Sequence, residues 1–342
     1  MRRGGRNAGL LLAGSLAGLA LALATRGPRY TLSGKVVLLT GGSRGLGLLM
    51  ARLLAAEGAR LALVARNAPD LERAAGELRR RGAAVLTLPA DVGDRQQVED
   101  AVDATVRHFG GLDVLINNAG VIEVGPLENQ SLDGFGTAMN VHFWGPLYAV
   151  RAALPYLKRS RGRVVNVASI AGKVAVPHLL PYTASKFALV GFSDGLRAEL
   201  ARDGVKVTTV LPWLTRTGSY RNVTVRGQHE GEFAWFAVSD SLPLLTMRGE
   251  DAAKAILAAL RRGAPRLILT PYGRAATALD ALFPGFVAAA AAAAGRLLPD
   301  AAPGAGAQKG FESRSALTPG WLTRLSDDAA ARNNQLGGDR RR

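Results

Sequence analysis

The chain has 342 residues, 48% of them hydrophobic, which allows one large α/β domain or two smaller ones and excludes a disordered protein. It contains no cysteine, which excludes disulfides, thiolate metal sites and cysteine nucleophiles, and its four histidines lack ligand spacing, so we expect no metal site. The net charge of +16 fits a nucleic-acid surface, a face near anionic lipid or solvated charge, and the lack of a nucleic-acid-binding motif in the sequence argues against the first.

The N-terminal segment 1–30 differs from the rest of the sequence. Residues 8–24 are apolar and lie between an arginine-rich start and Arg26. As a helix they would span about 25 Å, slightly less than the ~30 Å of a hydrocarbon core. Three interpretations remain open: a signal peptide cleaved after 22–24, an uncleaved anchor, or a helix that lies in the membrane interface.

Residues 31–272 alternate between short apolar runs and longer helical patterns, as expected for parallel strands covered on both faces. We expect strands at 36–40, 60–65, 84–88, 112–117, 163–168, 206–211 and 266–270. We expect helices at 46–57, 70–81, 95–109, 132–158, 183–201 and 250–262. The alternation predicts an α/β fold with one doubly wound parallel sheet and right-handed crossovers. Ligands of such sheets bind beyond the carboxyl ends of the strands.

The first expected strand runs into the glycine-rich turn 40–47, and a helix follows it. Glycines allow a tight turn and a close approach of the backbone to a pyrophosphate. The N-terminus of the next helix offers unpaired N–H groups and a partial positive charge. The strand before and the helix after favour a dinucleotide-binding turn over a structural one. We expect cofactor contacts from Gly41, Ser43, Arg44, Gly45, Leu46 and Gly47.

The end of the second strand indicates which dinucleotide binds. Arg66 follows Ala65 at the place where an NAD enzyme usually has a carboxylate for the ribose 2′-hydroxyl. A guanidinium matches the geometry of a phosphate, and Arg44 can reach the same group. The sequence therefore favours NADP(H). Further cofactor contacts are expected after the third and fourth strands, at Asp91, Val92, Asn118, Ala119 and Gly120.

The fifth strand ends at Ser169, and Tyr182 and Lys186 follow at the start of a long helix. Their separation of four residues puts the Tyr182 and Lys186 side chains on one helical face. A lysine cation and an oxidised nicotinamide would lower the phenol pKa from ~10 to about 7, which requires ~4 kcal/mol. Ser169 would orient and polarise a carbonyl oxygen. Asn140 would hold a water that links Lys186 to solvent.

From about residue 34 to residue 270 the sequence resembles the short-chain dehydrogenase/reductase family, through 40–47, 117–120, Asn140, Ser169, Tyr182 and Lys186. The resemblance implies one Rossmann-like domain with a seven-stranded parallel sheet, an NAD(P)(H) cofactor, and dimers or tetramers, so we expect a homo-oligomer. It also implies that Tyr182 is the acid/base, that Ser169 binds the carbonyl, and that Lys186 also grips the nicotinamide ribose. Asn140 would complete the proton relay.

One departure from the family lies after the sixth strand. The family usually has Pro-Gly there, and this chain has Pro212-Trp213, with Thr217 at the position expected to bind the carboxamide. Pro212 and Thr217 are therefore expected cofactor contacts. The missing glycine normally leaves room beside the nicotinamide, so Trp213 is expected either to crowd that pocket or to cap it.

The connection 213–248 is long and lies where this family closes over its substrate. Its aromatic residues indicate a lipophilic substrate, either steroid-, retinoid-, long-chain-base- or acyl-like, with contacts from Trp213, Tyr220 and Trp235. The alternative is that these aromatics only pack the lid onto the domain.

The C-terminal part has two sections. Residues 273–298 form an Ala-rich helical pattern interrupted by Pro284 and Gly285, which packs on the domain or touches lipid. Residues 299–342 lack an apolar period and are expected to be a partly disordered tail. Because reduced dinucleotide is a cytosolic resource, we expect segment 1–30 to be retained, with the enzyme on the cytoplasmic face of a membrane. Cleavage and export is the alternative.

Two other functions remain open. A non-catalytic NADP(H)-binding sensor or scaffold would not need the acid/base group, and only Trp213 supports it. An epimerase or dehydratase can share the Tyr–Lys pair, but such enzymes usually prefer NAD, so Arg66 argues against this alternative. The sequence thus predicts hydride transfer between NADP(H) and a carbonyl or secondary alcohol.

Overall fold

The computed structural model describes residues 30–243, 246–313, 315, 318, 320 and 323–336. The expected membrane-associated residues 8–24 lie outside this range. The chain divides into two compact units, Met1–Thr31 and Leu32–Arg342. The fold described below is that of the second unit.

A seven-stranded parallel sheet forms the centre of this unit, in the order β11-β7-β6-β4-β1-β2-β3. In β1, Leu38 pairs with Ala62 on one side and Leu115 on the other. The central strands are buried because both faces of the sheet are covered, as the apolar runs of the sequence predicted, whereas the edge strands β3 and β11 are partly exposed. The strands are β1 Val36–Thr40, β2 Arg60–Ala65, β3 Val85–Pro89, β4 Val114–Asn117, β6 Arg163–Val167, β7 Lys206–Leu211 and β11 Arg266–Ile268.

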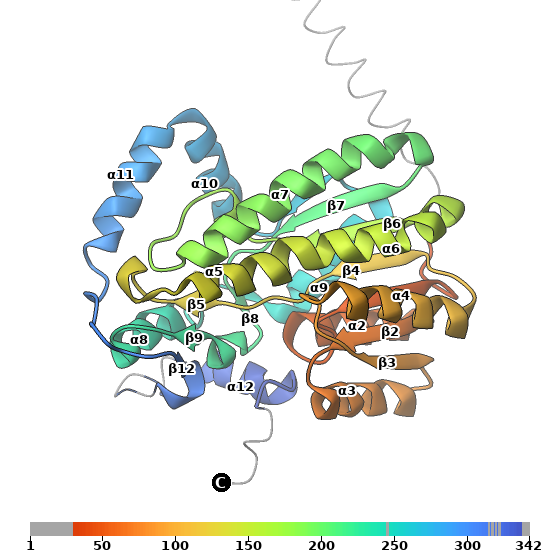
Figure 1. Cartoon of the computed structure of the whole chain (residues 1–342), viewed down its shortest axis with the longest axis horizontal. Helices are drawn as coiled ribbons and strands as arrows, with labels where there is room; N and C mark the ends of the chain where they lie inside the picture. Colours follow the sequence, from red (N-terminus) through yellow and green to blue (C-terminus); the bar gives the residue numbers. More distant parts are fainter. Residues whose placement is uncertain are drawn as a thin grey trace, which may run out of the picture. The chain divides into compact units, whose positions relative to one another are not determined.

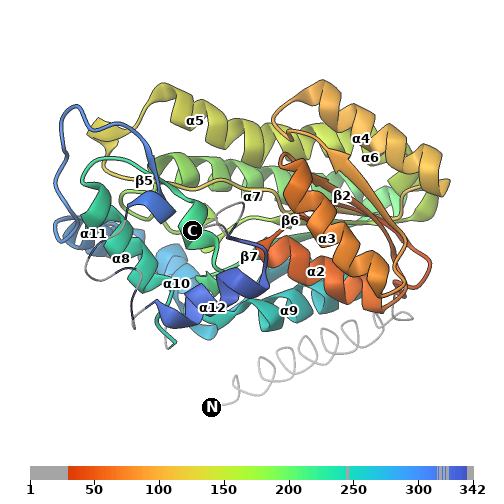
Figure 2. The ribbon, with the colours of Figure 1, turned by 90° about the horizontal axis from the view of Figure 1, so that it is seen from below.

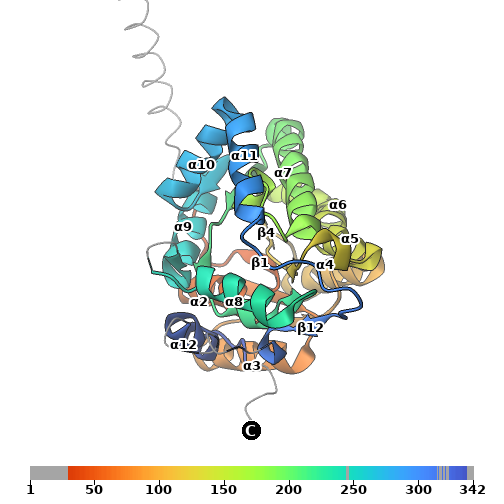
Figure 3. The ribbon, with the colours of Figure 1, turned by 90° about the vertical axis from the view of Figure 1, so that its left-hand side faces the viewer.

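Helices cover both faces of the sheet (Figure 3). On one face α2 (Gly45–Ala56) packs against α3 (Ala68–Arg80) and α9 (Gly249–Arg262). The other face carries α4 (Arg95–Phe109), α6 (Gly145–Ser160) and α7 (Leu180–Leu200). A cluster of buried aliphatic side chains from β1, β4, α4 and α6 fills the space between this second layer and the sheet. The predicted doubly wound fold is confirmed.

One crossover departs from the predicted right hand. The step from β1 to β2 through α2 and the step from β7 to β11 through α9 run toward opposite edges of the sheet, yet α2 and α9 pack together on one face. Two parallel crossovers that share a face and run in opposite directions have opposite hands, so the β7–β11 connection is left-handed. The right-handed rule reflects short βαβ units. Here the connection also contains a lid of several elements.

The predicted helix 132–158 is broken into three parts. Helix α5 (Leu132–Met139) and α6 are separated by η2, one π-helical turn over Asn140–Trp144. A π-turn holds an extra residue and shifts the register of the side chains that follow. It leaves Asn140 exposed and buries His142 completely.

The lid is built from short elements between β7 and α9. Within it, β8 (Thr215–Arg216) pairs with β10 (Met247–Arg248). The lid strand β9 (Thr224–Val225) lies between β5 (Glu123–Val124) and β12 (Gln308–Lys309), two strands from outside this connection. Helix α8 (His229–Ser239) packs on this small sheet. Single helical turns complete the unit at η1 Leu127–Asn129, η3 Ile170–Gly172, η4 Ala201–Asp203, η5 Ser219–Asn222 and η6 Gly310–Glu312.

The Ala-rich stretch 273–298 corresponds to two helices, α10 (Pro271–Leu282) and α11 (Pro284–Gly295), seen at one end of the unit in Figure 1. They meet at the predicted break, because Pro284 lacks the N–H that a continuous helix needs. No single helix in the described residues is long and apolar enough to span a membrane. The α10–α11 pair passes this test only together, with a bend of 118°.

The described part of the expected tail 299–342 is folded. The described part of 299–336 contains β12, η6 and α12 (Arg324–Arg332), which lies next to α2 in Figure 2. Helix α12 buries Ser326, Ala329 and Ala330, small residues that give no hydrophobic signal in a sequence. Asp327 accepts a hydrogen bond from the Tyr220 hydroxyl. Packing and hydrogen bonds to distant segments therefore order a stretch whose composition resembles a linker.

Candidate active site

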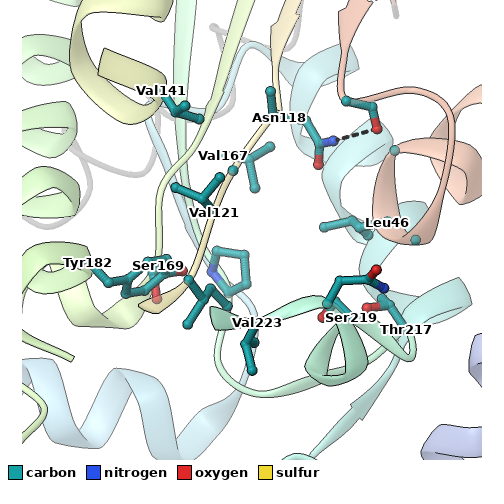
Figure 4. A pocket seen from close by; sticks show the side chains of 18 of the residues that line it. Leu46, Asn118, Val121, Val141, Val167, Ser169, Tyr182, Thr217, Ser219 and Val223 are labelled. Atoms are coloured by element: carbon teal, nitrogen blue, oxygen red, sulfur yellow. Dashed lines mark hydrogen bonds between the residues drawn. The ribbon is translucent and has the colours of Figure 1, made fainter. Parts of the chain in front are cut away.

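A cavity of about 730 Å³ opens at the carboxyl ends of the central strands. The glycine turn after β1, the ends of β2, β4, β6 and β7, the start of α7 and the lid all line it. Figure 4 shows Ser169 and Tyr182 on one side of this pocket and Leu46 and Thr217 on the other. Every expected cofactor contact lines the cavity: Gly41, Ser43, Arg44, Gly45, Leu46, Gly47, Arg66, Asp91, Val92, Asn118, Ala119, Gly120, Tyr182, Lys186, Pro212 and Thr217.

The turn between β1 and α2 needs its glycines. A side chain at Gly47 would place its Cβ 2.0 Å from the Gly41 carbonyl oxygen, and Gly45 has a φ of +56°. Asn118, from the end of β4, donates its side-chain amide to the Thr40 and Gly41 carbonyls at 3.1 and 3.2 Å. The Thr40 hydroxyl accepts the backbone N–H of Asn118 at 3.0 Å. The two strand ends thus fix a bare backbone turn that a pyrophosphate can approach closely.

Two arginines line the cavity beyond this turn. Nη1 of Arg66 lies 3.6 Å from a carboxylate oxygen of Asp91, and the Arg66 side chain is 59% exposed. Arg44 donates from Nη1 to the Asn222 side-chain oxygen at 2.9 Å. Burial lowers the pKa of Arg44, the Asp70 carboxylate opposes this, and the positive charge of Arg66 adds to it. The Asp70 carboxylate is paired with Arg73. The pair of guanidiniums fits a 2′-phosphate, so the residues present fit NADP(H).

Ser169 and Tyr182 meet at the opposite side of the cavity. The Ser169 hydroxyl, at the end of β6, accepts the Ala171 N–H at 3.1 Å. The Tyr182 phenol lines the cavity on the same side as Ser169 (Figure 4). Burial raises the pKa of the Tyr182 phenol, and hydrogen bonding from the nearby Ser169 side chain opposes this rise. A carbonyl oxygen placed between the two hydroxyls would receive two hydrogen bonds.

Lys186 lies one helical turn after Tyr182. Its ammonium group donates to the Val167 carbonyl at 3.0 Å and lies 5.5 Å from the centre of the Tyr182 ring. Burial lowers the pKa of Lys186 to about 7. The same burial that raises the phenol pKa also favours the neutral lysine, which reduces the charge available to stabilise a phenolate.

His142 joins this group, although the sequence analysis did not select it. The Val121 N–H donates to Nε2 at 3.1 Å, so the proton of a neutral imidazole is on Nδ1, which lies 2.8 Å from the Ser185 hydroxyl. The Ser185 hydroxyl donates to the Tyr182 carbonyl at 2.9 Å. Burial, together with the positive charge of Lys186, holds the His142 pKa well below its ordinary value. A neutral histidine therefore connects the loop after β4 to the first turn of α7.

The structure corrects the role predicted for Asn140. Its side chain is exposed and does not line the cavity. The Asn140 Cβ lies 3.3 Å from where a Cβ on Gly93 would be, so it sits beside the loop after β3. The π-turn places His142, two residues later, next to Tyr182 instead. The sequence signal for His142 is a histidine inside an otherwise apolar helical stretch. The sequence does not show that a π-turn changes the register of the side chains there.

The three predicted substrate residues have different places. Trp235 lines the cavity, and its indole N–H donates to Glu232 at 2.7 Å. Trp213 also lines it, with its ring edge-on to Tyr272 of α10 at 5.5 Å between centroids. Tyr220 is a wrong prediction, because its side chain is only 1% exposed, does not line the cavity and stacks on Phe233. Tyr220 holds the lid to α12.

Apolar side chains near Tyr182 line the cavity and form an apolar wall, made by Val174, Val176, Leu179, Trp235 and Phe236. The loop that carries the first three residues is tied to α8. Nδ1 of His178 lies 2.7 Å from a carboxylate oxygen of Glu232, which is completely buried. Burial raises the Glu232 pKa, and the hydrogen bond from Trp235 and the contact with His178 oppose the rise. This contact holds the loop that carries Val174, Val176 and Leu179 against α8.

Comparison with known proteins agrees with this geometry. Residues 35–226 match the family model described as short chain dehydrogenase. The "Dehydrogenase/reductase SDR family protein 7-like" of Anopheles gambiae is 34% identical over 288 residues, which cover 80% of this chain and 89% of the relative. The "11-beta-hydroxysteroid dehydrogenase 1A" of Arabidopsis thaliana is 42% identical over 183 residues, 53% of this chain and about half (52%) of the relative.

A similar solved structure is a short chain dehydrogenase from Burkholderia cenocepacia, crystallised in complex with NADP. It superposes with a TM-score of 0.63 at 30% identity, over 72% of this chain and 100% of that chain. The family match 35–226 spans the glycine turn and the group of Ser169, Tyr182 and Lys186.

Proposed function

The chain belongs to the short-chain dehydrogenase/reductase family, and on this premise we propose that it reduces a lipophilic carbonyl compound, or oxidises the matching secondary alcohol, with NADP(H). The observation that carries the proposal is that Ser169 and Tyr182 lie together in the same cavity as the glycine turn. A protein that only bound the dinucleotide would not need this pair at the end of the pocket.

The chain's own residues perform the proton transfer. In reduction, Ser169 and Tyr182 hold the carbonyl oxygen by hydrogen bonds, and Tyr182 donates its proton to that oxygen as the hydroxyl forms. Lys186, whose pKa is near 7, can return a proton toward the phenolate. When bound, the nicotinamide supplies the hydride for reduction or accepts it in oxidation. In the direction of oxidation, Tyr182 takes the proton of the alcohol.

The cavity supports NADP(H) as the cofactor. The turn at Gly41 and Gly45 has no side chains, which leaves space for a pyrophosphate. Arg44 and Arg66 provide two cations, and position 65 is an alanine rather than a carboxylate residue. A carboxylate at Ala65 would favour NAD(H). The complex of the Burkholderia cenocepacia relative with NADP is consistent with this assignment.

The apolar wall supports a lipophilic substrate, and among the classes named from the sequence a steroid-like ketone or alcohol has the most support. The Arabidopsis thaliana relative is named a hydroxysteroid dehydrogenase. Trp213, the residue that supported a non-catalytic sensor, packs against Tyr272 and leaves Ser169 and Tyr182 lining the same cavity. The sensor therefore loses its support.

The deciding experiment mixes the pure protein with NADPH and a set of ketones, some steroid-like and some small and polar, and follows NADPH consumption. We expect the steroid-like ketones to react fastest. Tyr182→Phe should bind NADPH like the parent protein and consume none. Faster turnover of small polar ketones would contradict the substrate class. Undiminished turnover by Tyr182→Phe would contradict the mechanism.

A membrane location is part of the proposal, on the cytoplasmic side where reduced dinucleotide is available. It is supported by the apolar residues 8–24 and by exposed apolar side chains at the α10–α11 corner, Leu282, Phe283 and Phe286. Co-sedimentation of the full chain with anionic vesicles tests it. Binding should fall in Phe283→Ser/Phe286→Ser, and a parent protein that stays in the supernatant would contradict the location.

A homo-oligomer is the second structural proposal. Large apolar side chains are exposed along α5, η2 and α7, at Leu132, Trp144 and Phe187. Such side chains on one helical layer are typical of subunit interfaces. Light scattering after size exclusion should give a dimer or tetramer, and Phe187→Glu should shift it toward the monomer. A monomeric parent protein would contradict this proposal.

A further inference from the structure

Two parts of the C-terminal region, Lys309 and residues 333–335, reach the dinucleotide-binding half of the cavity, although they lie outside the family match 35–226. Lys309 and Gln335 both line the same cavity as Arg44 and Gly45. Figure 3 shows α12, which leads to Gln335, beside α3. Residues from the far end of the chain therefore complete the wall around the glycine turn.

Residues 333–335 bind directly to the turn. The Asn333 carbonyl accepts the Gly45 N–H at 2.9 Å. The Asn334 side-chain amide donates to the carbonyls of Ser43 and Asp70 at 2.9 and 3.0 Å. Asn333 is 1% exposed, so this junction is part of the folded interior. Residues 333–335 thereby bind the outer side of the phosphate-binding turn.

Gln335 presents a defined amide to the cavity. Its Oε1 accepts from the Asn222 side chain at 2.8 Å, which orients Nε2 toward the turn. A Cβ on Gly45 would lie 2.5 Å from this Nε2. No hydrogen-bond acceptor for Nε2 is found among the residues that the structure describes. Asn222 also accepts from Arg44, so one network connects the lid, the turn and Gln335.

Lys309 adds a third cation to this half of the cavity. It is held by the pairing of β12 with β9, and its ammonium group donates to the Thr224 hydroxyl at 3.1 Å. Burial lowers its pKa, and the nearby charges of Arg66 and Arg44 lower it further, while Glu312 and Glu123 oppose this. Three like charges around one cavity repel one another, and a phosphate between them would relieve that repulsion.

We propose that Lys309 and residues 333–335 form a C-terminal clasp that completes the dinucleotide site, in which Lys309 binds the 2′-phosphate together with Arg44 and Arg66, and the Gln335 amide donates to the pyrophosphate. The clasp rests on the proposed function, because it requires NADP(H) in this cavity. It assigns a role in cofactor binding to the part of the chain that its sequence marked as a tail.

The test measures the affinities of the full chain for NADPH and NADH by fluorescence titration, so it does not depend on turnover. Lys309→Met keeps the aliphatic stem, removes the charge and should weaken NADPH roughly 10-fold while changing NADH less than about 2-fold. It should also make NADPH binding less sensitive to salt. Lys254→Met, an exposed lysine of α9, is the matched control and should change neither affinity.

Gln335→Glu tests the second contact. The glutamate is isosteric and keeps an acceptor for Asn222, so the fold is retained, but a negative charge replaces the amide donor. It should weaken NADPH and NADH alike, by roughly 10-fold or more. Unchanged affinities in both variants, or tighter binding in Gln335→Glu, would overturn the clasp. If the parent protein binds neither dinucleotide, the proposed function fails as well, which separates the two conclusions.

Discussion

The imidazole of His142 lies edge-on against the phenol ring of Tyr182, with 5.4 Å between the ring centroids. The histidine comes from the π-turn between α5 and α6, and the tyrosine from the first turn of α7. Through Ser185 the imidazole is also bonded to the Tyr182 backbone. The position of the acid/base group therefore depends on a neutral, buried histidine.

Replacing His142 by phenylalanine keeps the ring packing and removes both hydrogen bonds. We expect a loss of about 2–4 kcal/mol in the free energy of unfolding, because the Val121 N–H and the Ser185 hydroxyl lose a partner. The kcat per folded molecule should fall roughly tenfold or more as Tyr182 shifts, with an unchanged KM for NADPH. His108→Phe, on the exposed side of α4, is the control. A normal kcat in folded His142→Phe would show that the histidine is only structural.

Lys186→Met should stabilise the protein while abolishing activity. The lysine pKa is about 7 in the folded protein and 10.5 in the unfolded chain. Between these values the unfolded chain holds the extra proton, so the stability of the parent protein rises as the pH increases from 7 to 10.5. The variant lacks this dependence and should be more stable by about 2–4 kcal/mol near pH 7, with little difference at about pH 10.

Urea unfolding at the two pH values measures this effect. The lost hydrogen bond to the Val167 carbonyl reduces the gain without changing its pH dependence. Lys254→Met should show no such dependence. An equal stability difference at both pH values would mean that the buried amine is not neutralised on folding.

Arg66→Ala should change the choice between dinucleotides. The guanidinium is the nearest cation after β2 and is paired only loosely with Asp91 at 3.6 Å. We expect NADPH to bind roughly 10-fold more weakly, with NADH changed by less than about 2-fold. Titration of both dinucleotides provides the measurement, and Arg262→Ala on α9 serves as control. Equal weakening of NADPH and NADH binding would place Arg66 near a group that both dinucleotides contain.

Tyr220→Phe distinguishes an anchor from a substrate contact. The Tyr220 hydroxyl donates to Asp327 and lies outside the cavity. Its loss should lower the free energy of unfolding by about 1–3 kcal/mol and leave the KM for the ketone within roughly twofold of the parent value. Thermal unfolding and steady-state kinetics check the two parts. A large rise in KM with unchanged stability would restore Tyr220 as a substrate residue.

The sheet could be predicted from sequence because its strands are short, apolar and bounded by turn residues. Many residues around the cavity could be predicted for the same reason, since they follow a strand end, as Ser169 does after β6. A position defined by a strand end does not depend on distant packing. This is why Arg44, Arg66 and Asn118 all line the cavity as expected.

The errors concern features that tertiary contacts create. Asn140 and His142 are two residues apart, and only the π-turn decides which of them faces Tyr182. Tyr220 lies among aromatic lid residues, and its burial depends on Asp327, which is 107 positions away in the sequence. Helix α12 is ordered by contacts of small residues. None of these relationships produces a periodic pattern.

The path of the chain after β11 has a consequence for how the two ligands influence one another. Helix α10 starts beside Trp213 at the catalytic end of the cavity, and the same continuous stretch ends with Gln335 at Gly45. A ligand that moved this stretch at one site would therefore alter the other site. Thermodynamic linkage then requires the effect to be reciprocal, so a ketone that tightens NADPH binding must itself bind more tightly to the NADPH complex, by the same factor.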